Sequence, residues 1–346
     1  MKQLIYLVFI ICAGSFAACQ RQTLADQCAH KTALIPVQVD WSRSGINPTK
    51  GDGDDFVHRV SFRFFPKNGS KPFELYLEGN VNEGYLEVPT GSYDILIMNE
   101  SVHDVYWLDM VRFRNIDAFE SISAEVYPDN PAAYDFYTPA QNEQFMLDLP
   151  KMASWSIRNY EVTEETVVHT RAPIELQTID YTMYVPMQRL THDCRVIATV
   201  INLKSAQLIR GAKRGFANKV LLASRVTHNS PATLFFTFNG RKPLDGSKTD
   251  GTTEKTFRTF GALPVLFDYS LGVDVIFVDG RRHYPDDPSE LEFQVAEHVY
   301  SYFTKPGKST RVLPDKVEIP IKLILPEVSG DIDVGDWGDD ENVTIQ

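Results

Sequence analysis

Apolar residues recur at every second position in many short segments of this chain. The clearest segment lies near the C-terminus and consists of Val317, Ile319, Ile321, Leu323 and Leu325. Turn-forming sequences such as Asp279-Gly280 separate these segments, and nowhere does a long helical period replace the alternation. Because a β-strand places successive side chains on opposite faces, this pattern predicts an all-β fold of the sandwich or barrel type. Further segments of this kind begin at Ile35, Val60, Tyr93, Val196 and Val273.

The N-terminal residues have the pattern of a secretory signal. Leu4–Ile11 is an unbroken apolar run, and the mostly small residues Ala13–Ala18 follow it. This stretch is too short for a membrane-spanning helix, which needs about 20 apolar residues. Residues 1–18 are therefore expected to be a signal peptide.

Cys19 follows the small residues directly. This arrangement resembles the lipobox of bacterial lipoproteins, in which the chain is cleaved before a cysteine that then carries lipid. Cys19 is therefore predicted to be a lipidation site that anchors the chain to a membrane, with residues 19–32 as a polar tether. The alternative is ordinary secretion with an incidental cysteine at this position.

Length and composition predict two globular domains. The chain has 346 residues, of which 43% are hydrophobic, enough for real cores. We expect an N-terminal β-sandwich domain over residues 33–186 and a C-terminal one over residues 187–346. The final segment, Glu327–Gln346, carries seven carboxylates and no basic residue, and is expected to be a solvated tail.

Charge and cysteine content narrow the classes of partner. The formal net charge of −12 argues against a nucleic-acid partner, which requires a basic surface. The main basic cluster is Arg210, Lys213, Arg214 and Lys219, and Ser205–Phe216 is expected to be a short helix with these charges in solvent. Two cysteines remain after the signal peptide and Cys19, and they either form a disulfide in an oxidising compartment or stay apart. They are Cys28 and Cys194.

Sequence motifs for catalysis are not found. The chain has no Gly-x-Ser-x-Gly elbow and no His-Glu-x-x-His helix, and its histidines lack metal-ligand spacing. No catalytic residue, cofactor or metal ligand is therefore predicted. Asp331, Asp333 and Asp336 are spaced like oxygen ligands of calcium, but Asn342 stands where an EF-hand loop requires glutamate, so the question of calcium stays open.

Several motifs resemble a known family. They are Trp41, the segment Val60–Gly69, the segment Val88–Asp94 leading to Asn99, and the segment Gly335–Asp339. Together they are similar to a family of Bacteroidales lipoproteins described as a domain of unknown function, which is related to the fimbrillin-type fimbrial anchor proteins. The resemblance covers most of the mature chain.

This resemblance implies two tandem transthyretin-like β-sandwiches, attachment to the outer membrane through Cys19, and a role in or near surface fimbriae. It implies no catalytic residues. Surface-exported members carry acidic residues just after the lipidated cysteine, whereas Gln20-Arg21-Gln22 stands here. The membrane leaflet that the chain faces is therefore left open.

Two functional interpretations remain, and both are non-catalytic. The first is a fimbria-associated anchor, minor or adhesive subunit that binds fimbrial subunits by β-strand addition at an edge in the second domain, roughly residues 190–326. The second is a surface glycan-binding lipoprotein that exposes an aromatic platform. The candidates for that platform are Trp107, Tyr134 and Tyr137.

Overall fold

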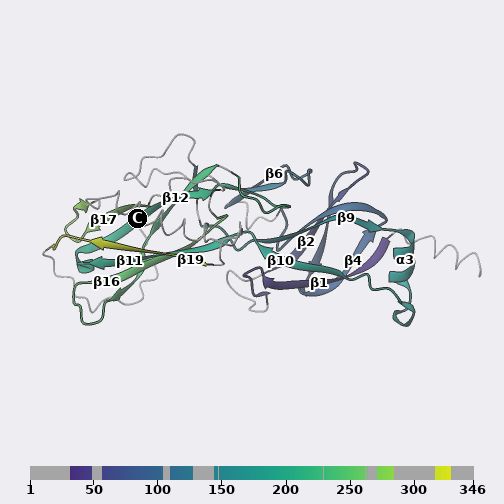
Figure 1. The fold of residues 1–346 in the computed structure, drawn as a ribbon, viewed down its shortest axis with the longest axis horizontal. Helices are drawn as coiled ribbons and strands as arrows, with labels where there is room; N and C mark the ends of the chain where they lie inside the picture. The colour runs from purple at the N-terminus through teal and green to yellow at the C-terminus, as the bar shows by residue number, and fades with distance from the viewer. Residues whose placement is uncertain are drawn as a thin grey trace, which may run out of the picture. The chain divides into compact units, whose positions relative to one another are not determined.

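The computed structural model describes nine parts of the chain. They are residues 32–48, 57–103, 110–127, 144–146, 148–228, 230–261, 263, 271–283 and 316–328. Strands dominate these ranges, and the predicted all-β fold is confirmed (Figure 1). The described residues form two compact units.

Unit 1 contains one seven-stranded sheet. Its described residues are 32–42, 57–101 and 155–187. The strands follow the order β3 (Phe73–Glu78), β2 (Arg59–Pro66), β5 (Gly91–Met98), β9 (Ala153–Val162), β10 (Met183–Arg189), β1 (Thr32–Arg43) and β4 (Glu83–Pro89). The two edge strands, β3 and β4, are consecutive in sequence. A Cβ atom on Gly84 would lie 2.4 Å from Leu77 Cδ1, so β3 and β4 lie close together near residues 79–82, which join them.

The alternation in the sequence becomes the core of this unit. On β1, the side chains of Ala33, Ile35 and Val37 are buried, and the residues between them are less so. Phe62 and Ile95, from the neighbouring strands β2 and β5, are also fully buried. Removal of these apolar side chains from water supplies the main driving force for folding of this unit.

Unit 2 is a sandwich of two sheets with a smaller third sheet. The four-stranded sheet has the order β15 (Asn239–Pro243), β16 (Gly251–Thr259), β11 (His192–Ile201) and β19 (Lys316–Ile324). The five-stranded sheet has the order β18 (Arg282–His283), β17 (Leu271–Phe277), β12 (Ala206–Ala217), β14 (Pro231–Thr237) and β8 (Gln144–Met146). The third has the order β13 (Lys219–Leu221), β7 (Ser123–Val126) and β6 (Val111–Arg114).

Aromatic side chains join the two larger sheets of unit 2. Phe257 on β16 lies with its ring centroid 5.6 Å from that of Phe216 on β12 and 5.3 Å from that of Phe236 on β14. All three side chains are buried. The cleanest alternation of the sequence forms β19, which pairs in parallel with β11, in agreement with its prediction as a strand (Figure 1).

The compact units differ from the expected domain limits. Residues 102–154 were assigned to the first domain at residues 33–186, but the described residues of this range cluster with unit 2. The physical reason is strand pairing over long sequence distances, because β8 pairs with β14 and β7 pairs with β13. The first unit is therefore assembled from three separate stretches of chain.

One local prediction was wrong. The segment Ser205–Phe216 is not a helix, because all but its first residue belong to the buried strand β12. A helix that the sequence pattern did not indicate, α3 (Glu164–Arg171), follows strand β9 in unit 1. Thr163 caps this helix: its hydroxyl accepts from Thr166 N at 3.2 Å, and Thr166 Oγ1 accepts from Thr163 N at 3.2 Å.

Candidate binding site

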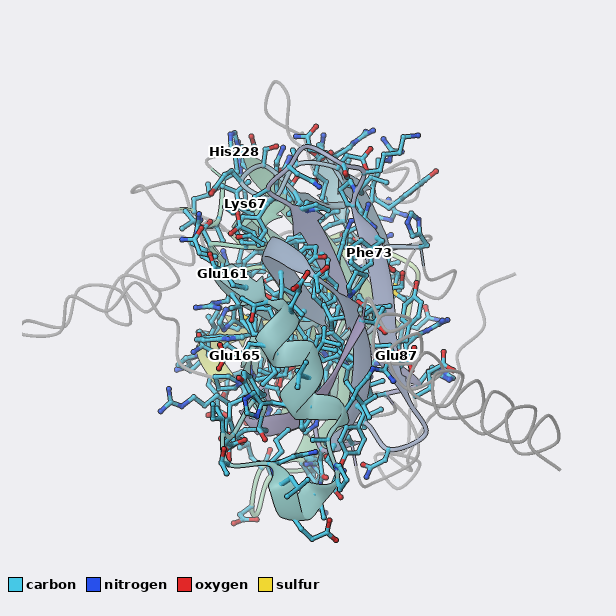
Figure 2. The ribbon with its side chains drawn as sticks, turned by 90° about the vertical axis from the view of Figure 1, so that its right-hand side faces the viewer. Lys67, Phe73, Glu87, Glu161, Glu165 and His228 are labelled. Carbon is cyan, nitrogen blue, oxygen red and sulfur yellow. The ribbon has the colours of Figure 1, made fainter. Side chains whose placement is uncertain are left out.

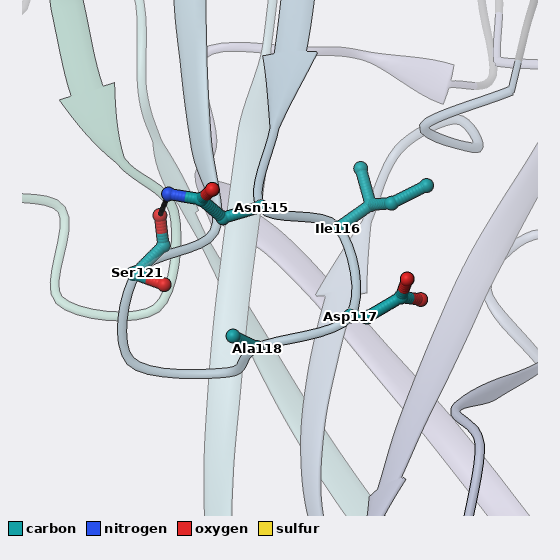
Figure 3. Close-up of a pocket in the computed structure, with 5 residues that line it drawn as sticks. All are labelled: Asn115, Ile116, Asp117, Ala118 and Ser121. Carbon is teal, nitrogen blue, oxygen red and sulfur yellow. Dashed lines mark hydrogen bonds between the residues drawn. The ribbon is translucent and has the colours of Figure 1, made fainter.

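A shallow pocket lies in the loop between β6 and β7. Its volume is about 500 Å³, and five residues of this single loop line it (Figure 3). Asn115 Nδ2 donates to the carbonyl of Ser121 at 3.3 Å across the loop, and Asn115 has a φ of 53°. Asp117 is the one ionisable residue of the lining. A catalytic site needs several convergent polar groups, so this pocket offers no candidate chemistry.

The carboxylate of Glu74 in unit 1 accepts hydrogen bonds from three neighbouring side chains. Glu74 accepts from the Tyr76 hydroxyl at 2.6 Å, from Ser101 Oγ at 2.7 Å and from Arg63 Nη1 at 2.8 Å. Burial raises the pKa of Glu74, but these hydrogen bonds and the charge of Arg63 outweigh it, so the pKa lies below its ordinary value. A fully bonded carboxylate of this kind stabilises the fold and is poorly placed to act as an acid or base.

Basic residues of the expected solvated cluster lie inside unit 2. Arg210 is 8% exposed and Lys213 is fully buried. Arg210 Nε donates to Asp274 Oδ2 at 2.9 Å from the neighbouring strand, and Asp274 is fully buried as well. The prediction that this cluster faces solvent was therefore wrong for these two side chains, and the pair is part of the core.

Cys194 lies on β11 and is a free, buried thiol. Burial raises its pKa to about 12, opposed by the charge of Lys213 and assisted by that of Asp193. A thiol with this pKa is inert at neutral pH, because the thiolate is the reactive form. Cys28, the partner considered for a disulfide, lies outside the described residues.

Other predicted sites lie outside the described ranges. They are the lipidation site Cys19, the aromatic residues Trp107, Tyr134 and Tyr137, and the acidic residues Asp331, Asp333 and Asp336. Within the described ranges, no group of three or more His, Cys, Asp or Glu side chains is arranged to hold a metal ion. No helix in this part of the chain has the length and apolar character needed to cross a bilayer.

The edge strand β4 presents backbone hydrogen-bonding groups. Val39 N donates to Asn82 O at 2.7 Å, whereas Leu34 N turns the other way and donates to Thr170 Oγ1 at 3.1 Å. Because N–H groups alternate between the two sides of a strand, the odd-numbered residues of β1 bond to β4. Tyr85 and Glu87 lie opposite the even-numbered residues Pro36 and Leu34, so their own backbone groups point away from β1. On that side of β4 no strand of the described residues pairs, and we call it the open edge of β4.

The two edge strands of the four-stranded sheet in unit 2 differ from β4 in the residues that they carry. The described edge strand β19 contains Pro320, which lacks an N–H, and the exposed Lys322. The other edge of that sheet, β15, is five residues long and contains Arg241, Lys242 and Pro243. Lysine and proline at an edge discourage pairing with another strand. By comparison, β4 has seven residues, no lysine, and a proline only at its end.

Two exposed tyrosines lie on the seven-stranded sheet of unit 1. Tyr85 on β4 is 61% exposed and Tyr184 on β10 is 63% exposed. Both strands flank β1 in the sheet, and both side chains alternate with more buried neighbours and so point away from the core. The sequence did not single out either residue, because exposure of a strand tyrosine depends on which face the fold leaves uncovered.

Comparison with solved structures finds similar chains at low sequence identity. A candidate adhesin from Bacteroides ovatus has a TM-score of 0.49 and 14% identity, over 88% of this chain and 96% of that one. The fimbrial anchor protein Mfa2 from Porphyromonas gingivalis has a TM-score of 0.43 and 11% identity, over 85% and 90%. A candidate polysaccharide-binding protein from Bacteroides thetaiotaomicron has a TM-score of 0.44 and 12% identity, over 85% and 92%.

The search of curated proteins finds no match. The scan against family models matches residues 18–237, well over half of the chain, to a domain of unknown function named DUF5119. The match agrees with the resemblance noted from the sequence to a family described in those words. The chain belongs to the DUF5119 family.

Proposed function

We propose that the chain is a non-catalytic lipoprotein of the outer membrane, anchored through Cys19, that binds fimbrial subunits as an anchor, minor or adhesive component. The observation that carries this proposal is the open edge of β4, where Tyr85 and Glu87 present backbone groups outward. An extended segment of a partner gains affinity from such backbone hydrogen bonds, and side-chain contacts supply specificity.

The acceptor edge is assigned to unit 1 in this proposal. The sequence led to the expectation that it lies in residues 190–326. The described edges β15 and β19 of that region carry the proline, lysine and arginine residues that oppose pairing, whereas β4 has no lysine or arginine and a proline only at its end. The contrast between the edges therefore favours β4.

A second candidate function is glycan binding. It is favoured by the exposed rings of Tyr85 and Tyr184 on one outward surface of the sheet. Aromatic side chains with an apolar face and a polar hydroxyl are well suited to contact ligands at a wet surface. Strand addition requires the backbone N–H of Tyr85, whereas glycan binding requires its ring.

That difference defines the experiment. The mature chain with Cys19→Ser is assayed for binding to fimbrial subunits of the same host and on a glycan array. Tyr85→Pro removes an outward N–H without removing a donor to β1, and Tyr85→Ala removes the ring but keeps the N–H. Strand addition predicts that Tyr85→Pro loses subunit binding while Tyr85→Ala retains it.

A different result of the same experiment would contradict the fimbrial proposal. Reproducible glycan binding that Tyr85→Ala abolishes, with no subunit bound, would replace the fimbrial proposal by the glycan one.

Anchoring is tested separately by fractionation of host cells. The parent chain should stay with membranes and Cys19→Ala should appear in soluble fractions, so equal membrane retention of both would exclude the anchor.

A further inference from the structure

Exposed apolar side chains gather at the α3 end of unit 1. Of the ten large hydrophobic side chains that are exposed in the described ranges, four lie between residues 168 and 179. Ile174 and Leu176 belong to the short 3-10 helix η4 (Ile174–Leu176) and are 75% and 64% exposed. Val168 on α3 is 69% exposed and Ile179 is 44% exposed. Such a local concentration marks an interaction surface more often than scattered apolar residues do.

This surface is built on an ordered framework. Thr170 Oγ1 donates to Thr166 O at 2.8 Å within α3. Gln177 Nε2 donates to Ala172 O at 2.9 Å, and the rings of His169 and Tyr181 lie 6.1 Å apart. These contacts tie the segment after α3 back to the helix. The apolar side chains are thus held outward by their surroundings.

The chain enters unit 1 at this same end. Arg171 Nε donates to Thr32 O at 2.7 Å, and Arg171 Nη2 donates to Thr32 Oγ1 at 2.8 Å. Leu34 N also donates to Thr170 of the helix at 3.1 Å. Thr32, the first described residue of β1, is therefore hydrogen-bonded directly to α3.

The tether between Cys19 and unit 1 is short, because Thr32 is the thirteenth residue after Cys19. A flexible chain of that length has an average end-to-end distance of roughly 20 Å, and it can reach about 45 Å when fully extended. A lipid attached to Cys19 would therefore keep the α3 end close to the bilayer, whichever way the tether bends.

We propose that residues 164–182 form a lipid-facing surface, through which Val168, Ile174, Leu176 and Ile179 enter the headgroup region of the membrane that holds the Cys19 lipid. This inference rests on the anchor in the proposed function and adds an orientation to it. Contact with the bilayer would orient unit 1 with its α3 end towards the membrane. Apolar burial at the interface would add to the affinity that the acyl chains provide.

The charges around this surface specify the kind of lipid. Glu164 and Glu165 lie in the first turn of α3 and Glu175 lies in η4, and Figure 2, which looks onto this end, shows Glu165 with Glu161 and Glu87 also in view. Carboxylates are repelled by an anionic surface over about a Debye length. The surface therefore fits a zwitterionic membrane, and anionic lipid should weaken the contact.

The test uses a chemical tether, so that it does not depend on lipidation in the cell. In the mature chain with Cys28→Ser, the remaining thiols are Cys19 and the buried Cys194. This chain is coupled through Cys19 to maleimide lipid in phosphatidylcholine vesicles. Hydrogen exchange is then followed along the whole chain. The reference is the same chain mixed with vesicles that lack the maleimide lipid.

We expect several-fold slower exchange in residues 164–182 of the tethered chain only, and less slowing when phosphatidylglycerol is included. The double variant Ile174→Asn and Leu176→Asn should lose this protection. Ile324→Asn is the matched control, because Ile324 is 68% exposed but lies in unit 2, and it should keep the protection. All of these positions are exposed, so the variants are expected to fold.

Equal exchange in the tethered and untethered chains, or protection that persists in the double variant, would overturn the lipid-facing surface. Protection that instead appears on addition of a fimbrial subunit, without vesicles, would assign the surface to a protein partner and overturn it too. A failure of membrane anchoring in host cells would contradict the proposed function, and this result is independent of the vesicle measurement. The two failures are therefore distinguishable.

Discussion

A Cβ atom placed on Gly91 would lie 2.7 Å from the Tyr93 hydroxyl oxygen. Gly91 has a φ of 157°, a backbone conformation that residues with a side chain rarely adopt. The Tyr93 hydroxyl also donates to Pro89 O at 3.0 Å, which holds the ring over the turn. Both the backbone conformation and the ring therefore exclude a side chain at position 91.

Gly91→Val should consequently lower the free energy of unfolding of unit 1 by ~1–3 kcal/mol. Urea unfolding followed by circular dichroism measures the change. Gly69→Asn is the matched control: Gly69 has a φ of 79°, a Cβ atom placed on it would meet no atom within 4 Å, and Asn tolerates this backbone region. Equal loss of stability in both variants would contradict the role of Tyr93.

The hydrogen-bonded Glu74 predicts a specific response to acid. Its folded-state pKa is depressed, so the stability it contributes is present above the ordinary value of 4.5 and is lost as the pH falls through the folded-state pKa. Unfolding free energy should decrease below pH 4.5 in the parent chain. In Glu74→Gln it should be lower at neutral pH but depend less on pH in this window.

Urea titrations at several pH values between neutral pH and the acid limit of solubility provide the measurement. Tyr76→Phe removes one of the three hydrogen bonds to the carboxylate and serves as an intermediate variant. An identical slope of stability against pH in the parent chain and in Glu74→Gln would show that another carboxyl group dominates the acid response.

The buried thiol of Cys194 predicts chemical inertness. With a pKa raised to about 12 by burial, the thiol should not react with a disulfide reagent at pH 8 in the native chain carrying Cys19→Ser and Cys28→Ser. It should react fully after unfolding in urea. Rapid reaction in the native state, monitored by absorbance of the released thiolate, would contradict the burial of this side chain.

Strand positions could be predicted from the sequence where a strand has one buried and one exposed face. The alternation of Ile35, Val37 and Val39 predicted β1, and the same pattern at residues 317–325 predicted β19. In these segments the local period of two is the direct consequence of the final environment. The all-β class followed from the repetition of such segments.

Prediction failed where local propensity and environment disagree. Helix α3 contains β-branched Thr166, Val167 and Val168, which favour strands, and it forms because Thr163 caps it and its buried face packs on unit 1. Strand β12 contains Arg210 and Lys213, which the sequence alone places in solvent. Their burial depends on partners such as Asp274, which lies 64 residues away from Arg210.

The candidate binding edge could not be predicted for a related reason. Whether Tyr85 lies on an open edge depends on β1 pairing with β4 on one side and on no described strand pairing with the other. Likewise, the described residues between 102 and 154 include β8, which joins unit 2 by pairing with β14. Pairing of distant strands is not encoded in the period of either strand, so the sequence leaves it undetermined.

The buried ion pair of Arg210 and Asp274 gives a prediction about the core of unit 2. Asp274 is fully buried and Arg210 is 8% exposed, so removing one partner leaves a buried charge without its counter-charge. Asp274→Ala should therefore lower the free energy of unfolding by about 3–5 kcal/mol. Replacing both charges with apolar residues of similar size, Arg210→Met with Asp274→Leu, should cost clearly less than the single substitution.

A double-mutant cycle in urea tests this expectation, with Arg210→Met and Asp274→Leu as its single variants. The coupling between the two sites should be large because their side chains are in direct contact. Arg195 and Glu318 form the matched surface pair, at 3.1 Å and with side chains 26% and 46% exposed, and their coupling should stay within about 1 kcal/mol. Equal coupling in both pairs would mean that burial does not determine the strength of the Arg210–Asp274 interaction.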